Sequence, residues 1–510
     1  MTGDWRIDNF EEDVPGGLIE RIWARDPSVW AAGEDDPSER LGWLDLPDSI
    51  RGELAPVEAF VRDTGSYMDR AILLGMGGSS LAPEVFAACF GTQPGHPLLT
   101  ILDSTHPTHI ETVAAELGGS KNLFLVSSKS GGTIETMSLY HFFRERAEDA
   151  RDYSFAAITD PGTSLQELGK AEDFAGVFLN PPDLGGRYSA LSLFGLVPAA
   201  LIGVDLDALL SGAAEMAEAC GPKAPVADNP GLAIGHALGT LAARGRDKLT
   251  FFTSDALAPF GDWVEQLVAE SSGKAGHGIV PVTGEPPAEG YGNDRVFVDL
   301  RLQDDASLDG IVDGLAEAGH PVIHLPVRGP EELGAQMFLW EFATAIACSV
   351  LGVNAFDQPD VEAAKRAGRE ALASSEVIVW EDEDISALFE DAAPGDYAAF
   401  LAFTPRSVEA ASVLDRARKK VGRDGEVATT AGFGPRYLHS TGQLHKGGPD
   451  SVRALVILDP PQSDLAIPGE EYGFSRLLQA QAAGDYRALR RAGKRVARTG
   501  WARFEEWASS

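Results

Sequence analysis

The segment NLFLVSSKSGGTIETMSLYHFF, residues 122–143, decides the fold that we predict for this chain. It begins with a short apolar run, continues through a polar turn and ends with helical periodicity. The turn, residues 127–133, offers four hydroxyl groups, two glycines and Lys129 at the start of the helix. Small hydroxyls and free N–H groups at a helix start suit the terminal oxygens of a phosphate monoester. We therefore predict a strand, a phosphate-binding turn and a helix.

The same pattern recurs on both sides of this segment. Upstream, AILLGMG (71–77) precedes the helical stretch GSSLAPEVFAACFG (78–91), and TILDSTHP (100–107) is a further strand with its turn. Downstream, SFAAITD (154–160) is another apolar strand. Strands that alternate with helices in this way predict a parallel, doubly wound sheet, which binds ligands at the carboxyl ends of its strands.

A second α/β unit starts near Lys248, and its helix WVEQLVAESSGK (263–274) carries a candidate catalytic base. Gln266 and Glu270 lie four residues apart, so both side chains project from one face of the helix. A carboxylate that stands beside an amide, next to a glycine-containing turn, suits general base catalysis. The unit continues with strands at 249–255, 278–284, 295–302 and 321–327 and a long apolar helix at 333–352.

We predict an α/β protein of two doubly wound domains with an extension at each end. Residues 1–55 have the pattern of an arm of short amphipathic helices, and residues 56–240 and 241–370 form the two domains. Residues 371–510 form an α/β extension, in which a helical tail at 477–498 closes the chain. A chain of this length needs more than one hydrophobic core.

The amino-acid composition limits the kinds of partner that we expect for this protein. The net charge of −35 repels phosphate backbones, which argues against nucleic acid as a partner. The sequence has no uninterrupted apolar run of about 18 residues and no secretory leader, so we expect a cytoplasmic protein without a membrane partner. The scattered Cys89, Cys220 and Cys348 fit neither a disulfide framework nor a zinc site, and we expect small buried residues.

Isolated polar residues mark further candidate positions. Arg187 follows two glycines just before an apolar helix, and Lys365 lies in the first turn of a helix, where its charge opposes the helix dipole. One glycine-rich loop concentrates five polar residues: Arg436, His439, Gln443, His445 and Lys446. This loop has no carboxylate or cysteine at metal-ligand spacing, so we expect no metal and interpret one histidine as a proton-transfer group.

Five motifs together resemble the phosphoglucose isomerase family, which is built from two sugar-isomerase (SIS) domains. The motifs are GMGGSSLAP (75–83), SSKSGGTIET (127–136), LGGRYSALS (184–192), EQLVAESSGK (265–274) and NAFDQPDVEAAK (354–365). With YLHSTGQLHKGGP (437–449), the whole chain is most similar to the isomerase half of the bacterial transaldolase/phosphoglucose isomerase fusion, and a transaldolase half is absent here.

The resemblance implies roles for the matching residues. Glu270 would move a proton between C1 and C2 of the sugar, Arg187 would stabilise the enediolate, and Lys365 would act in ring opening or polarisation. Substrate contacts are implied for Gly78, Ser79, Ser128, Lys129, Ser130, Thr133, Gln266 and Gln358. This chemistry needs a base, cationic donors and a dry pocket, so we expect no metal and no cofactor.

One departure from the family concerns the ring-opening histidine, which ordinarily lies between the base helix and the FDQP segment. That interval holds His277 close to the base and His320 and His324 further on, whereas LHSTGQ follows FDQP here. We hypothesise that His439 takes this role, from its own chain or across a dimer interface. His445 is the second candidate.

The resemblance implies reversible isomerisation of glucose 6-phosphate and fructose 6-phosphate by a homodimer. A dual isomerase that also accepts mannose 6-phosphate is one alternative, and a non-catalytic sugar-phosphate sensor is another. Glu270, Arg187 and Lys365 together argue against the sensor, because a sensor needs no base aligned with two cations. Association with a separate transaldolase stays open.

Overall fold

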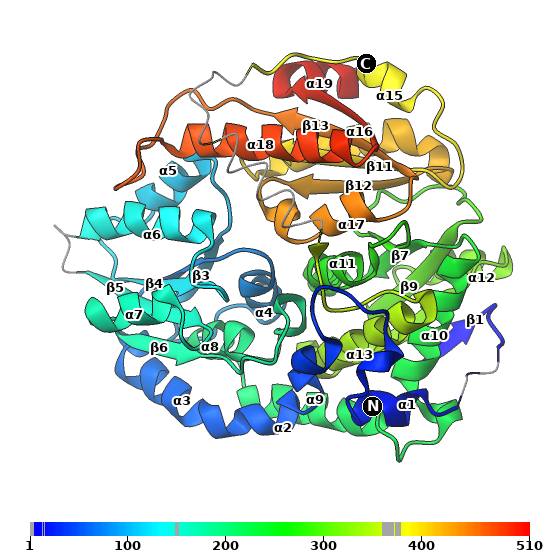
Figure 1. Ribbon diagram of the computed structural model, residues 1–510, viewed down its shortest axis with the longest axis horizontal. Coiled ribbons are helices and arrows are strands. Elements are labelled where there is room, and N and C mark those ends of the chain that lie inside the picture. Colours follow the sequence, from blue (N-terminus) through cyan, green and yellow to red (C-terminus); the bar gives the residue numbers. More distant parts are fainter. Residues whose placement is uncertain (1–4, 13, 15, 148–151, 360–371, 373–378) are drawn as a thin grey trace.

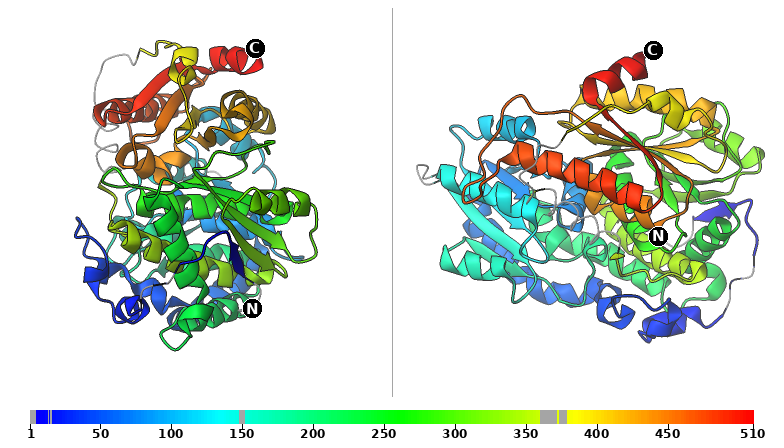
Figure 2. Two further views of the ribbon diagram at one scale, coloured as in Figure 1. Left: turned by 90° about the vertical axis from the view of Figure 1, so that its right-hand side faces the viewer. Right: turned by 45° about the horizontal axis from the view of Figure 1, so that its top comes forward.

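The computed structural model describes residues 5–12, 14, 16–147, 152–359, 372 and 379–510. Three β-sheets form its framework, and helices pack around each of them (Figure 1). The N-terminal arm and the third sheet lie at opposite ends of the molecule, as Figure 2 shows from two further sides. The predicted α/β class with parallel sheets is confirmed.

The first sheet has five parallel strands in the order β3-β2-β4-β5-β6. In chain order, β2 to β6 span Arg70–Leu74, Leu98–Leu102, Asn122–Ser127, Tyr153–Thr159 and Gly176–Leu179. Its helices are α4 (Leu81–Phe90), α5 (Pro107–Ala115), α6 (Ile134–Ala147), α7 (Ser164–Ala171) and α8 (Leu193–Leu201). Because β2 and β4 are neighbours, the polar turns that follow them leave the sheet next to each other.

The second sheet has the order β1-β10-β9-β7-β8. Strands β7 (Lys248–Thr253), β8 (Val280–Val282), β9 (Arg295–Leu302) and β10 (Val322–Val327) are parallel, as predicted. The predicted helical arm also contains a strand that the sequence reasoning missed: β1 (Arg6–Asp8) pairs antiparallel with β10. A three-residue edge strand is too short to show a period in the sequence.

The third sheet has four parallel strands in the order β12-β11-β13-β14. They span Ala428–Phe433, Tyr397–Phe403, Val452–Leu458 and Arg495–Gly500. The predicted helical tail is therefore wrong at its end: α18 (Phe474–Arg491) stops, Gly493 turns with a φ of +73°, and β14 follows. Basic residues and alanine favour a helix, but burial of Val496 and Ala497 beside β13 overrides that preference.

The remaining helices pack on these sheets or join them. They are α1 (Leu18–Trp23), α2 (Leu46–Ser49), α3 (Leu54–Asp63), α9 (Leu206–Ala219), α10 (Pro230–Ala243), α11 (Ala258–Ser272), α12 (Asp309–Glu317), α13 (Leu333–Leu351), α15 (Ile385–Phe389), α16 (Val408–Gly422), α17 (Gly442–Gly447) and α19 (Trp501–Ser509). Cys220 and Cys348 are buried, Cys89 is half-buried, and all three are free thiols. The boundaries of the four predicted domains stay predictions.

Helix α13 is the central helix of the largest core. Among the described residues, one helix, Pro330–Leu351, is long and apolar enough to span a membrane, but 89% of its most apolar window is buried inside the protein. The arm packs on it through Trp43, whose ring centroid lies 5.9 Å from that of Phe338 and 5.3 Å from that of Tyr188. This packing fixes the turn that precedes Tyr188, where Arg187 lies.

Candidate active site

The predicted base lies at the C-terminal end of α11. Glu270 is only 5% exposed, and its Oε2 accepts a hydrogen bond of 3.0 Å from Nε2 of Gln266. The same Nε2 donates to the carbonyl oxygen of His439 at 2.8 Å. The four-residue spacing on α11 therefore places Gln266 where it orients the carboxylate of Glu270. The backbone of His439, in the C-terminal extension, in turn orients the amide of Gln266.

Arg187 faces the carboxylate from a turn of the first unit, Gly186–Tyr188. Its Nη1 lies 3.7 Å from Oε1 of Glu270, and both side chains are buried. Its other nitrogens are held: Nε donates to Ser271 Oγ at 2.8 Å, and Nη2 donates to the carbonyls of Ala355 and Asp357 at 2.6 and 2.9 Å. The guanidinium thus has a fixed orientation and presents one edge to the base.

The glycine turn after β2 makes close approach of three loops possible. A Cβ on Gly77, whose φ is +54°, would lie 2.6 Å from the carbonyl oxygen of His439. A Cβ on Gly78 would lie 2.0 Å from the carbonyl oxygen of Gly186. Real Cβ atoms do not approach other atoms so closely, so this turn requires glycine to bring Arg187 and His439 to one place.

The predicted phosphate-binding turn lies beside this glycine turn. Oγ of Ser127 donates to the carbonyl oxygen of Ser79 at 2.9 Å, which joins the two turns. The hydroxyls of Ser128 and Thr133 are 2.9 Å apart, and Nζ of Lys129 lies 2.5 Å from Oδ2 of Asp160.

The hydroxyl of Ser130 completes this turn. It accepts a hydrogen bond of 3.4 Å from the backbone N–H of Gly132. The turn ends where α6 begins at Ile134, so free N–H groups, hydroxyls and one lysine converge at a helix start.

His439 reaches this place within its own chain. Its Nε2 lies 2.9 Å from Oε1 of Glu135, in the first turn of α6, and Gln481 Nε2 donates to the same carboxylate oxygen at 2.7 Å. Thr105 Oγ1 in turn donates to Gln481 Oε1 at 2.8 Å. Delivery of His439 from a partner subunit is therefore not required.

Arg436 anchors the segment that carries His439. Its Nη1 lies 2.7 Å from Oδ2 of Asp103, and its Nη2 contacts the carboxylates of Glu84 and Asp262. These three carboxylates come from both α/β units, so one buried guanidinium ties the C-terminal extension to each of them.

His445 makes its side-chain contact inside the C-terminal extension. It is buried against Tyr397, whose hydroxyl is 3.0 Å from Nδ1. Burial, with a smaller effect of Lys446, lowers the pKa of the imidazole to about 3. The imidazole is therefore neutral at pH 7, and its role as the second candidate stays a prediction.

Two predicted residues belong to the FDQP segment. Gln358 is half-buried and directly follows Asp357, whose carbonyl holds Arg187. Lys365 lies outside the described residues, so its implied role in ring opening or polarisation stays a prediction.

Lys274 and Asp357 also belong to the site, although the sequence reasoning gave them no role. Lys274 Nζ lies 3.0 Å from Oδ1 of Asp357 and donates to the carbonyl of Asn354, so it holds the segment that also holds Arg187. Burial first, and then Arg187, lower the pKa of Lys274 to about 8, while Asp357 opposes the shift. Its position four residues after Glu270 in ESSGK could have indicated this.

Glu135 is the third residue with a role that was missed. It is the penultimate residue of SSKSGGTIET and lies in the first turn of α6, where the favourable interaction of a carboxylate with the helix dipole is the ordinary explanation of an acidic residue. Only its distance to His439 points to proton transfer. No group of three or more His, Cys, Asp or Glu that could hold a metal ion occurs among the described residues.

The fold and this cluster define an α/β protein of the sugar-isomerase-domain class. A solved structure of a hypothetical protein from Thermus thermophilus matches 72% of this chain and 100% of its own, with a TM-score of 0.61 and 27% identity. A glucose-6-phosphate isomerase from Chlamydia trachomatis matches 72% and 80%, with a TM-score of 0.50 and 18% identity, a likeness of fold alone.

Sequence comparison gives the family. The phosphoglucose isomerase family model matches residues 55–279. A glucose-6-phosphate isomerase from Thermosynechococcus vestitus is 31% identical over 423 residues, which cover 71% of this chain and 77% of that protein. One from Rubrobacter xylanophilus is 29% identical over 72% of this chain and 96% of its own length. This chain belongs to the phosphoglucose isomerase family.

Proposed function

We propose that this protein interconverts glucose 6-phosphate and fructose 6-phosphate by proton transfer through a cis-enediolate. The observation that carries the proposal is the buried pair of Glu270 and Arg187, 3.7 Å apart and each held by further hydrogen bonds. A base and an immobile cation at one place suit abstraction of a proton next to a carbonyl group. The family's relatives named glucose-6-phosphate isomerase support the same substrate.

The chemistry follows from these positions. The turn 127–133 holds the phosphate, and in the open-chain aldose Glu270 takes the proton from C2. The electron pair of the C–H bond forms the C1–C2 double bond, and the carbonyl pair moves to O1, where Nη1 of Arg187 stabilises the negative charge. Glu270 then returns the proton to C1 while the O2 proton is transferred to O1, so that C2 becomes the carbonyl carbon and the product is the neutral ketose. Gln266 keeps the carboxylate oriented throughout.

Turnover by purified protein tests the proposal. We expect fructose 6-phosphate to be converted to glucose 6-phosphate with the rate unchanged by EDTA, because Arg187 supplies the positive charge. Saturable binding of fructose 6-phosphate without turnover would support the sensor instead. The comparisons give no support to that sensor or to a dual activity on mannose 6-phosphate.

His439 is proposed to open the sugar ring, with Glu135 fixing its tautomer. We expect His439→Ala to lower kcat on glucose 6-phosphate by about 10²–10⁴-fold, the usual contribution of an acid–base group. A tetrose 4-phosphate cannot close a ring, so its isomerisation should change by less than about threefold. Glu135→Gln should show the same preference for the open-chain substrate.

The matched control is His141→Ala, since His141 is exposed on the helix that carries Glu135. Full activity of His439→Ala on the cyclic substrate would refute the assignment.

Lys274 is proposed to position Arg187 and to set an alkaline limit on activity. Its pKa of about 8 means that the charged form, and with it the ion pair to Asp357, is lost as the pH rises through 8. The groups nearby are Asp357, Arg187 and Cys348. We expect kcat of the wild type to fall above about pH 8. Lys274→Met should lower kcat by up to about 100-fold below pH 8, and its pH–rate profile should lack the fall at alkaline pH. A pH–rate profile in which Lys274→Met keeps the alkaline limb would contradict the proposal.

The assembly is proposed from the family resemblance. We propose a cytoplasmic homodimer that acts in glycolysis and gluconeogenesis, with a separate transaldolase as a candidate partner. Light scattering of the purified chain, alone and mixed with a transaldolase, tests both associations, and a monomer at micromolar concentration would contradict the first.

A further inference from the structure

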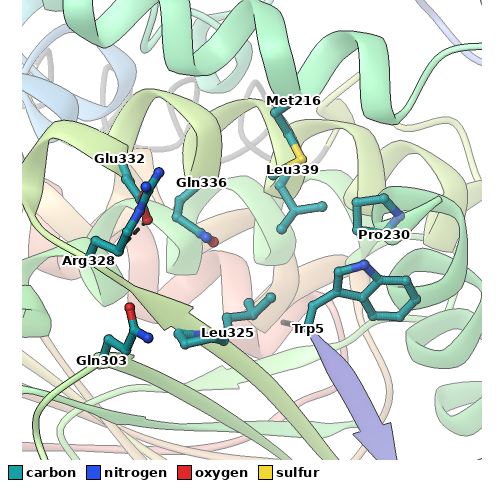
Figure 3. A pocket seen from close by; sticks show the side chains of 10 residues that line it. Trp5, Met216, Pro230, Gln303, Leu325, Arg328, Glu332, Gln336 and Leu339 are labelled. Carbon is teal, nitrogen blue, oxygen red and sulfur yellow. Dashed lines mark hydrogen bonds and ion pairs between the residues drawn. The ribbon is translucent and has the colours of Figure 1, made fainter. Parts of the chain in front are cut away.

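A pocket of about 150 Å³ opens at the edge of the second sheet (Figure 3). Gln303 directly follows β9 and Arg328 directly follows β10, so the pocket lies at the carboxyl ends of two neighbouring parallel strands. Ligands of α/β proteins commonly bind at this edge. The pocket shares no lining residue with the cluster around Glu270.

One wall of the pocket is apolar. It consists of Trp5 just before β1, Met216 of α9, Leu325 of β10 and Leu339 of α13. Figure 3 shows the indole of Trp5 on one side of the space, with Leu325 and Leu339 beside it. Met216, Leu325 and Leu339 are each 5% exposed or less. This wall fits a flat or compact hydrocarbon body.

The opposite wall contains one unsatisfied acceptor. Gln336 is 5% exposed, and its Oε1 is buried with no hydrogen-bond partner in the described part of the chain. Figure 3 shows its carboxamide directed into the space between Arg328 and Leu325. A buried carbonyl oxygen without a donor is costly, and a ligand N–H or O–H would satisfy it.

The two charged residues that line the pocket, Arg328 and Glu332, neutralise each other. Both carboxylate oxygens of Glu332 are taken by Arg328, one through the side-chain Nε and the other through the backbone N–H at 3.0 Å. The pocket therefore adds no uncompensated charge that would select an anion or a cation.

We propose that this pocket binds a small neutral molecule with one apolar ring and a hydrogen-bond donor directed at Gln336 Oε1. The size is set by the volume, since an apolar cavity of about 150 Å³ in another protein takes up benzene. The specificity is set by Gln336, which distinguishes a ring with an O–H or N–H group from the bare ring. The site is independent of the isomerase chemistry.

Calorimetric titration of the full chain with phenol, and with toluene as the ring without a donor, tests the proposal. We expect saturable binding of phenol at one site, about 3- to 10-fold tighter than toluene, the contribution of one hydrogen bond. Gln336→Leu should abolish this preference while toluene still binds. Isomerase turnover, expected to be unchanged in Gln336→Leu, serves as the check of folding.

Leu339→Trp is the second variant, because the larger side chain fills the pocket and should remove binding of both probes. The proposal is overturned if neither probe binds the wild-type chain saturably, which would mean that the pocket holds only water. It is equally overturned if Gln336→Leu keeps the full preference for phenol.

Discussion

Glu270→Gln is expected to lower kcat for fructose 6-phosphate by about 10²–10⁴-fold, with KM changed by no more than a few-fold. Glutamine keeps the size of the side chain and its neighbour Gln266, but an amide cannot accept the proton from carbon. The phosphate-binding turn is untouched, so substrate binding should survive. Initial rates over a range of substrate concentrations separate the two parameters.

The matched control is Glu265→Gln on the same helix. Burial raises the pKa of Glu265 to about 8, so this carboxyl is largely neutral at pH 7 and glutamine replaces it with little electrostatic change. We expect kcat of this variant within about twofold of the wild type. Equal losses in both variants would mean that α11 is merely disturbed, and a fully active Glu270→Gln would remove Glu270 as the base.

Arg187→Met is expected to lower kcat by about 10²–10³-fold, the usual cost of removing one donor that stabilises developing negative charge. The variant also releases the carbonyls of Ala355 and Asp357, which Nη2 holds at 2.6 and 2.9 Å. Arg187→Lys keeps the charge but cannot reach three partners at once, so we expect only partial recovery of kcat.

The control for Arg187→Met is Arg62→Met, since Arg62 pairs with Asp63 on the surface and should leave kcat unchanged. Circular dichroism and thermal unfolding show whether the Arg187 variants fold. A folded Arg187→Met with wild-type kcat would contradict the proposed stabilisation of the enediolate.

The local pattern of apolar and polar residues made much of this fold predictable from the sequence. The strands β2, β4 and β7 are five or six residues long, and each contains a short run rich in apolar residues that ends at a polar turn, a pattern that favours a strand. Glu270 and Gln266 were predicted to face the same way because helix geometry alone decides it. Burial and a hydrogen bond of 3.0 Å agree with that prediction.

The missed features depend on contacts between distant segments. Strand β1 forms because Arg6–Asp8 pairs with β10, and β14 forms because a basic segment pairs with β13. In the same way, Glu135 and His439 are 304 residues apart in the chain, and Lys274 and Asp357 meet across two elements. A sequence shows the residue types in such pairs, but only the packed structure shows that they touch.

The central claim is that Glu270 moves a proton between C1 and C2, and proton NMR of fructose 6-phosphate in D₂O with the purified protein tests it most directly. A proton held on a carboxylate exchanges with solvent, so we predict glucose 6-phosphate that carries deuterium at C2 in part of the molecules, with both turnover and exchange lost in Glu270→Gln. Glucose 6-phosphate formed at an undiminished rate by Glu270→Gln, or saturable binding of fructose 6-phosphate with neither turnover nor exchange by the wild type, would contradict the account.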